Sequence, residues 1–225
     1  MNIWHRIAIL AACTVCLPVV ALANNSGWYV AADVGQSHFT GNEYPTNTFF
    51  THVPFTDTDS GYRLAAGYQF NSYWGLEAGY LDLGQITGKE DYVNPGHCTL
   101  FCFAPSSYYI NENFKSHGWS IEFTGTYLFN EHWSVFAHAG AIDARSDSNV
   151  YYTPIPPYES GEQPFNTSYD STNWGSIYGF GVNWVFADKW GVRLSWDRYS
   201  NLGNNDNFAG TYSVNLATLG VVFWF

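Results

Sequence analysis

The stretch YGFGVNWVFADKWGVRLSWD, residues 178–197, contains two runs of strict alternation on either side of a tight turn. Apolar side chains occupy the even-numbered positions: Tyr178, Phe180, Val182, Trp184, Trp190, Val192, Leu194 and Trp196. The odd-numbered positions are mostly glycine or polar, and they include Arg193 and Asp197. A period of two belongs to a β-strand with one apolar and one polar face. The stretch therefore predicts a β-hairpin with its turn at 187–189.

The same alternation recurs along the chain in stretches of about ten residues, which is the length a tilted strand needs to cross a hydrocarbon core. We expect eight strands, near 28–35, 61–70, 74–84, 118–129, 133–145, 174–186, 190–199 and 213–225. After the N-terminus there is no uncharged run of about 18 apolar residues, so a spanning helix is excluded. Any residence in a membrane must then come from strands.

One parity of these strands is apolar, and the other carries nearly all of their charges. The charged positions of the polar parity are Asp33, Arg63, Glu77, Glu122, His138, Arg193 and Asp197. A soluble eight-stranded ligand-binding barrel would show the same alternation with its apolar face inward. Parity alone therefore leaves the orientation open.

Three features favour an outward apolar face. The motif Phe-x-x-x-Trp recurs at 70–74, 129–133 and 186–190, as short turns bracketed by aromatic residues. Short connections alternate with long ones at 36–60, 85–116, 146–171 and 200–212, as in outer-membrane barrels. Glycines on the polar parity leave room for a narrow, charged lumen. We predict an all-β, eight-stranded, antiparallel up-and-down transmembrane barrel with short periplasmic turns and long extracellular loops.

An aromatic girdle is expected at the periplasmic interface of this barrel. It comprises Trp28, Phe70, Trp74, Phe129, Trp133, Phe186, Trp190 and Phe225.

The hairpin at 178–194 and the ending LGVVFWF, residues 219–225, resemble the outer-membrane protein A-like family of eight-stranded barrels. The likeness extends over 24–225. It implies that Phe225, with Phe223 two residues before it, is the signal read by the barrel-assembly machinery. Some members continue into a peptidoglycan-binding domain, and we do not expect that tether here because the sequence ends at Phe225.

The N-terminus reads as a bacterial export signal over residues 1–23, with Arg6, an apolar stretch, and a small-x-small site at Ala21 to Ala23. A lipoprotein-type cleavage before Cys13 is the weaker alternative, since the apolar stretch continues past it. We expect a mature barrel domain of residues 24–225, located in a bacterial outer membrane. The formal net charge of -11 excludes nucleic acid as a partner.

Depth along the strands predicts which lumen charges meet. Counted from the girdle, Glu77 and Arg193 lie at one level and Asp33 and His138 at the next. The deepest level holds Arg63, Glu122 and Asp197. Because a lone buried charge is costly, we expect a stacked ion-pair network that closes the lumen. The alternative is that strand stagger scrambles the levels and water solvates some of the charges.

Cys98 and Cys102 lie in the longest predicted loop of an exported protein, which favours a disulfide. With His97 they supply only three ligands, short of a closed zinc site. No cofactor is expected.

The four predicted loops contain eleven acidic residues and two lysines, together with many aromatic residues. Together these loops could bind a host protein or a second envelope protein. Alternatively, these loops pack on each other and extend the strands above the lipid. We favour a monomeric structural or surface-interaction protein, surrounded by outer-membrane lipid and lipopolysaccharide.

A lipid A-modifying hydrolase is the second functional candidate, and a small solute channel is the third. The segment 197–201 faintly resembles the catalytic stretch of outer-membrane deacylases, but Arg198 stands where a histidine would activate Ser200.

Overall fold

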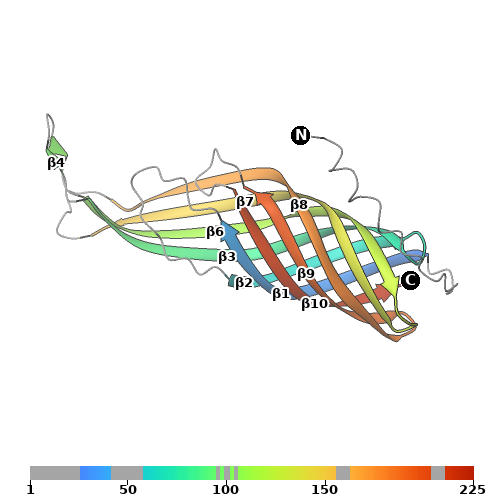
Figure 1. Cartoon of the computed structure of the whole chain (residues 1–225). Helices are drawn as coiled ribbons and strands as arrows, with labels where there is room; N and C mark the ends of the chain where they lie inside the picture. Colours follow the sequence, from blue (N-terminus) through green and yellow to red (C-terminus); the bar gives the residue numbers. More distant parts are fainter. Residues whose placement is uncertain are drawn as a thin grey trace, which may run out of the picture.

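The computed structural model describes residues 26–41, 58–94, 97–98, 102–103, 106–155, 163–203 and 211–225. Eight antiparallel strands form a closed barrel in the order β1-β10-β9-β8-β7-β6-β3-β2 (Figure 1). They are β1 (Gly27–Gly41), β2 (Thr58–Gln69), β3 (Trp74–Asn94), β6 (Ser106–Leu128), β7 (Trp133–Pro154), β8 (Phe165–Ala187), β9 (Trp190–Leu202) and β10 (Tyr212–Trp224). Two short strands, β4 (His97–Cys98) and β5 (Cys102–Phe103), pair with each other between β3 and β6. The predicted fold class is confirmed.

Four strands are much longer than a bilayer requires. β3, β6, β7 and β8 contain 21, 23, 22 and 23 residues, whereas about ten residues cross the hydrocarbon core. The expectation that 85–116 and 146–171 are loops is therefore wrong for most of these residues. The alternative, in which they extend the strands, is confirmed. The physical reason is that polar alternation continues to form sheet beyond the lipid, where no apolar band marks it.

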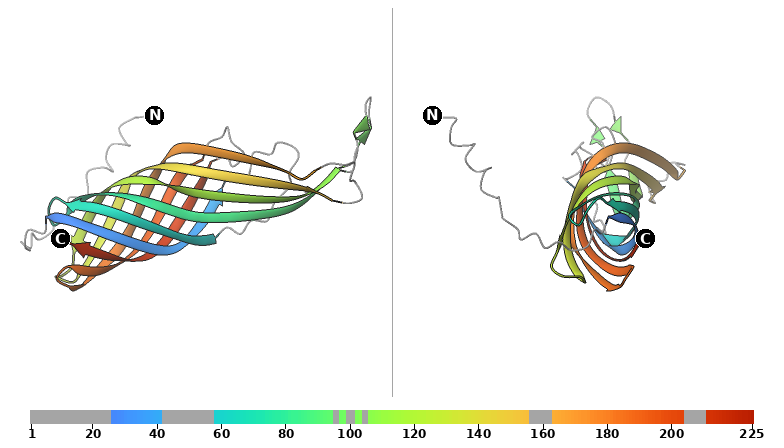
Figure 2. Two further views of the ribbon diagram at one scale, coloured as in Figure 1. Left: turned by 180° about the vertical axis from the view of Figure 1, so that it is seen from behind. Right: turned by 90° about the vertical axis from the view of Figure 1, so that its right-hand side faces the viewer.

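The long strands form a sheet that projects from one end of the barrel (Figures 1 and 2). β3 stays paired with β6 as far as Asn94, and β7 with β8 as far as Phe165. Their outer neighbours stop earlier, since β2 follows β3 only to Asp82 and β9 follows β8 only to Ser176. We call residues 85–94, 106–117, 144–154 and 165–175 the projecting sheet. Within the described residues both of its edges, on β3 and on β8, have one neighbour only.

The opposite end of the barrel consists of tight turns. In the turn 70–74, Asn71 Oδ1 accepts hydrogen bonds from the amides of Tyr73 (2.8 Å) and Trp74 (3.0 Å). Asn130 does the same in the turn 129–133, at 2.9 Å from both amides. An Asn side chain that satisfies the turn amides in this way explains why the repeated Phe-x-x-x-Trp motif reverses the chain so tightly.

The apolar parity faces outward, as predicted. Trp119, Phe123 and Leu194 are 67, 50 and 58 % exposed, whereas Arg63 and Glu122 are 1 % exposed in the lumen. The exposed apolar band reaches from the tight turns to an outer belt that contains Tyr62, Trp119 and Trp174. We take the strand segments between these limits as the membrane-spanning segments. None of the described residues forms a helix long and apolar enough to span a membrane.

Candidate functional site

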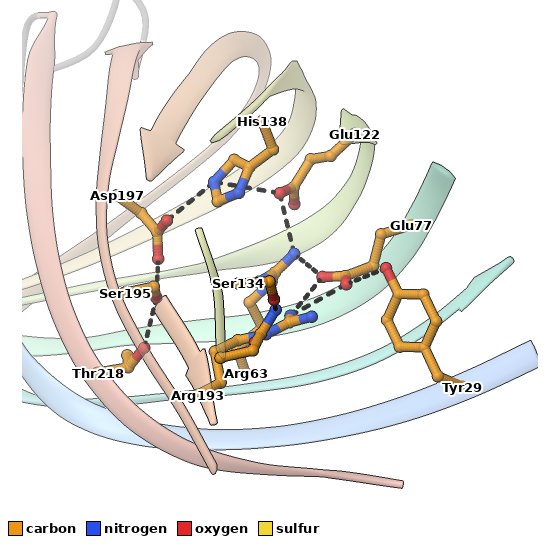
Figure 3. A network of polar contacts seen from close by, with 11 residues as sticks. Tyr29, Arg63, Glu77, Glu122, Ser134, His138, Arg193, Ser195, Asp197 and Thr218 are labelled. Carbon is orange, nitrogen blue, oxygen red and sulfur yellow. Dashed lines mark hydrogen bonds and ion pairs between the residues drawn. The ribbon is translucent and has the colours of Figure 1, made fainter. Parts of the chain in front are cut away.

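Glu77 is the centre of a polar network inside the barrel (Figure 3). It lies on β3 and accepts hydrogen bonds from Arg63 of β2, from Arg193 Nη1 of β9 (3.0 Å) and from the Tyr29 hydroxyl of β1 (2.7 Å). All four side chains are at most 4 % exposed. One carboxylate therefore serves two guanidinium groups, in a place where water is largely excluded.

The network continues away from Glu77 toward the middle of the lumen. Arg63 Nη2 also lies 2.9 Å from Glu122 Oε2. His138 Nε2 is 3.5 Å from that same oxygen and 2.8 Å from Asp197 Oδ1. Ser195 Oγ donates to the other oxygen of Asp197 at 3.0 Å. The sequence analysis identified the ionic residues of this network but missed the neutral donors Tyr29 and Ser195. The inward parity of these two residues could have identified them.

A glycine makes room for the pair formed by His138 and Asp197. A Cβ atom added at Gly179 of β8 would lie 2.6 Å from His138 Nε2 and would also meet the Asp197 carboxylate. Contacts below 3.0 Å force something to move, and here the obstructing groups are held in an ion pair. The absence of a side chain at 179 is thus a structural requirement of the network.

Asp33 is the exception in the lumen. It is 1 % exposed, and neither of its carboxylate oxygens has a hydrogen-bond partner among the described residues. Asp33 lies opposite Arg63 in the register of β1 and β2, but Arg63 reaches to Glu77 and Glu122 instead. The Asp33 carboxylate occupies the space above Gly220 of β10. Among the described residues, the lumen thus holds four carboxylates against two guanidinium groups and one imidazole.

The three expected charge levels do not survive as separate layers. Asp33 and His138, assigned to one level, make no ion pair with each other within the described residues, and His138 pairs with the deeper Asp197. Arg63 joins the deepest level to Glu77 in the shallowest one. The long guanidinium side chain and the stagger of the strands carry contacts across levels. The result is one connected chain of charges.

Arg193 forms the floor of a cavity at the turn end of the barrel. The cavity has a volume of about 580 Å³, and turn residues such as Asn130 line its mouth. The Arg193 guanidinium lies 5.7 Å from the ring centre of Tyr29 and 4.8 Å from that of Phe136, and its Nε donates to Asn183 Oδ1 at 3.2 Å. Between the network and the tight turns, the lumen is therefore open.

An apolar cluster closes the other side of the network, where the polar lumen expected from the sequence ends. We call it the apolar cap; it comprises Phe39, Leu81, Leu83, Phe114, Ile142, Ala144, Ile177, Tyr199, Leu202, Tyr212, Val214 and Leu216. All of these residues are at most 7 % exposed. Several of them lie in segments expected to be loops, which is why the sequence reasoning missed the cap. Continuing the inward parity past each strand would have revealed it.

Hydrogen bonds tie the apolar cap together at its outer side. The Tyr212 hydroxyl donates to Ser116 Oγ (2.8 Å) and lies 2.6 Å from Ser146 Oγ, beyond the membrane-spanning segments. Burial raises the pKa of Tyr212 to about 12, so this hydroxyl keeps its proton at neutral pH. The Tyr212 ring also packs edge-on against Phe114, with ring centroids 4.9 Å apart.

The eight aromatic residues expected in the periplasmic girdle lie around the turn end and are between 46 and 70 % exposed. They are Trp28, Phe70, Trp74, Phe129, Trp133, Phe186, Trp190 and Phe225. Phe223 packs on Trp190 with centroids 4.7 Å apart and on Phe225 at 5.2 Å. The Phe225 amide donates to the Trp28 carbonyl at 3.0 Å, so the chain end continues the β1–β10 seam.

Three other expectations fall wholly or partly outside the described residues. The export signal over 1–23 lies outside them. Cys98 and Cys102 are opposed in the backbone pairing of β4 and β5, while their side chains lie outside the described part, so the disulfide stays a prediction. Among the described residues no three His, Cys, Asp or Glu side chains are grouped to hold a metal ion.

Comparison with known proteins identifies a family whose model matches this sequence. Residues 23–225 match the model of the OmpA-like transmembrane domain. The chain is 23 % identical over 208 residues to outer membrane protein A of Serratia marcescens and 22 % identical over 206 residues to that of Klebsiella pneumoniae. These alignments cover 91 % of the chain but only 51 and 53 % of the two relatives, so the chain spans about half their length.

Among solved structures, the chain is similar to Ail of Yersinia pestis in complex with the heparin analogue sucrose octasulfate. The TM-score is 0.45 and the identity 15 %, over 89 % of this chain and 99 % of that one. It is also similar to Neisserial surface protein A, at a TM-score of 0.44 and 14 % identity over 89 and 98 % of the two chains. Because the family model covers nearly the whole sequence, the conclusion follows that this chain belongs to the OmpA-like transmembrane domain family.

Proposed function

We propose that the protein is a structural and surface-interaction component of a bacterial outer membrane, adhesion-like in its action, with a lumen that does not conduct. The observation that carries the proposal is the contrast between its two parts. Beyond the cavity at the turn end, the lumen is occupied by the charged network and then by the apolar cap, which supports a barrel that does not conduct. The projecting sheet, by contrast, extends four strands beyond the membrane-spanning segments.

The projecting sheet supports an interaction role through its edges and its side chains. Residues 165–172 of β8 form an edge strand with one charged residue, Asp170, which is 72 % exposed. Unblocked edge strands add further strands from partners. The exposed rings of Tyr109, Tyr151 and Phe165 offer contact anchors on the same sheet.

The negative charge of the predicted loops indicates which class of molecule they would bind. Eleven acidic residues against two lysines repel polyanions and favour a host or envelope protein with a basic surface. The sulfated heparin analogue bound by Ail is a ligand of that protein. We do not extend such a ligand to this chain, because its charges are opposite to those that a sulfated glycan requires.

Adhesion of a non-adherent bacterial strain that displays the chain tests this function. We expect binding to cultured host cells and no retention on heparin-coated beads. The variant Asn166→Lys with Thr172→Lys places two cations on the β8 edge and should reduce adhesion several-fold. The matched control, Asn111→Lys with Thr153→Lys, adds the same charge to β6 and β7, away from the edge. Adhesion no greater than that of the parent strain would refute the proposal.

Membrane placement is proposed in finer detail as well. We infer export through residues 1–23, assembly through Phe223 and Phe225, and a monomer surrounded by lipopolysaccharide in the outer leaflet. The exposed apolar band supports the lipid contact. N-terminal sequencing should begin at Asn24, and the unboiled protein should migrate differently from the boiled protein on a gel.

The two other candidate functions make separate predictions. A lipid A hydrolase would release acyl chains and lose that activity in Ser200→Ala, but His138 contacts Asp197 and Glu122 rather than serving Ser200. A channel would give steady conductance in planar bilayers. We expect neither acyl release nor conductance.

A further inference from the structure

The cavity at the turn end of the lumen is large enough to hold a small molecule. Its volume of about 580 Å³ lies within the range of roughly 300–1,000 Å³ that is typical of ligand pockets. Residues of the turns 129–133 and 186–190 line its mouth. The charged network and the apolar cap occupy the lumen beyond it. A ligand would therefore enter from the turn side.

The cavity meets the charged network at a single cation. Of the charged residues described in the lumen, Arg193 alone lines the cavity. Glu77, which pairs with Arg193, does not form part of the cavity wall. The surplus of carboxylates in the lumen is thus screened from the cavity by the guanidinium group, and the floor of the cavity is cationic.

The Arg193 guanidinium keeps one nitrogen for a ligand. Its Nε donates to Asn183 Oδ1 at 3.2 Å, and its Nη1 donates to Glu77 Oε2 at 3.0 Å. Nη2 makes no hydrogen bond to the described residues, and it is not one of the fully buried unpaired atoms. The rings of Phe136 and Tyr29 hold the group in place from 4.8 and 5.7 Å. A fixed and partly used guanidinium is suited to bind a carboxylate oxygen.

A second donor lies beside Arg193. Ser134, Asn183 and Arg193 form one row across β7, β8 and β9, because Asn183 is paired with both of the others in the strand register. All three side chains line the cavity. Asn183 Nδ2 lies 3.5 Å from Ser134 Oγ, at the limit of a hydrogen bond, so it can turn to a better acceptor. Two donors in one row match the two oxygens of a carboxylate.

The remaining wall and the mouth restrict the ligand further. The rings of Tyr29, Phe136 and Trp224 line the cavity and offer apolar contact to a flat body. Lys189 lies four residues from Arg193, about 13 Å along an extended strand, so the two cations do not meet one small anion. One guanidinium balances one negative charge, which favours a monocarboxylate over a phosphate dianion.

We propose that the cavity at the turn end binds a small organic molecule with one carboxylate and an apolar, ring-containing body. The carboxylate contacts Arg193 and Asn183, and the body packs against Tyr29, Phe136 and Trp224. This site is separate from the projecting sheet, so it does not depend on the proposed surface interaction.

Fluorine NMR titration of the folded barrel in lipid nanodiscs tests the site, with 4-fluorobenzoate as the probe. We expect saturable binding of one molecule per barrel. 4-Fluorobenzamide has nearly the same shape without the charge, and it should bind about tenfold more weakly. Inorganic phosphate at constant ionic strength should not displace the probe.

Two variants and one control locate the binding in the cavity, after heat-dependent gel migration has shown that each is folded. Ser134→Trp fills the cavity and should weaken 4-fluorobenzoate binding about tenfold. Val135→Trp, the next residue of β7 with its side chain toward lipid, is the matched control and should bind as the wild type does. Arg193→Lys keeps a cation beside Glu77 but loses the planar fork, and it should also weaken binding about tenfold.

Each alternative result contradicts the proposal. Absence of saturable binding to the wild-type barrel overturns it, and this measurement requires no variant to fold. Equal affinity for the benzoate and the benzamide removes the role of Arg193. Displacement by phosphate overturns the assignment to a carboxylate. Equal binding by Ser134→Trp and Val135→Trp places the probe in the lipid or on the outer surface.

Discussion

Removing the charge of Glu77 should destabilise the barrel more than removing any other single charge in the lumen. Glu77→Gln keeps the shape of the side chain but leaves Arg193 without a carboxylate contact, whereas Arg63 retains Glu122. Breaking a buried ion pair by removing one partner costs about 3–5 kcal/mol. With a urea dependence of about 2–3 kcal/mol per molar, the unfolding midpoint should fall by about 1–2.5 M.

The assay is urea unfolding of the barrel refolded in lipid vesicles, with the folded fraction read from the migration of unboiled samples. Asp33→Asn is the matched control, since it removes a lumen carboxylate that accepts no hydrogen bond in the described structure. That variant should be neutral or stabilising. Combining Glu77→Gln with Arg193→Met should recover part of the loss, because the stranded guanidinium is gone. An unchanged midpoint for Glu77→Gln or for Arg193→Met alone would refute a stabilising network.

Three further predictions concern other parts of the molecule. Gly179→Leu should lower the same urea midpoint, because its side chain must displace an ion pair; a midpoint equal to that of the wild type would contradict this account. Burial raises the pKa of Glu112, in the projecting sheet, above its ordinary value of 4.5. The folded state thus favours the protonated acid, and this contribution to stability is lost as pH rises through the raised pKa. Glu112→Gln carries no such charge, so it should gain stability over the wild type between about pH 4.5 and neutral pH. Parallel urea titrations of the two proteins measure the difference. Thiol alkylation of the unfolded, unreduced protein should label neither Cys98 nor Cys102, and labelling before reduction would exclude the disulfide.

The sequence was sufficient for the barrel because its spanning strands obey two rules at once. Positions such as Leu194 and Arg193 alternate between lipid and lumen, and the short aromatic turns fix where each strand begins. Lipid imposes a strict outward chemistry, so parity identifies the face of each residue. The inward placement of the charged residues followed from the same constraint.

The remaining features depend on geometry that parity does not contain. Stagger between strands decides which charges meet, and the reach of Arg63 joins levels that a residue count keeps apart. The projecting sheet lies beyond the lipid, so its strands show no apolar outward face. The apolar cap was missed for another reason: Phe39 and Phe114 keep the inward parity of their strands but lie in segments that were expected to be loops.

Because the apolar cap closes one end of the lumen, the interior of the barrel opens at its turn end. With the tight turns toward the periplasm, as proposed above, the apolar cap separates the ionic network from the outside of the cell, and the cavity beside Arg193 opens toward the periplasm. Protons, salt and urea should therefore equilibrate with the buried charges from the cell side, and acidification of the surroundings should reach them only after the periplasm itself has changed.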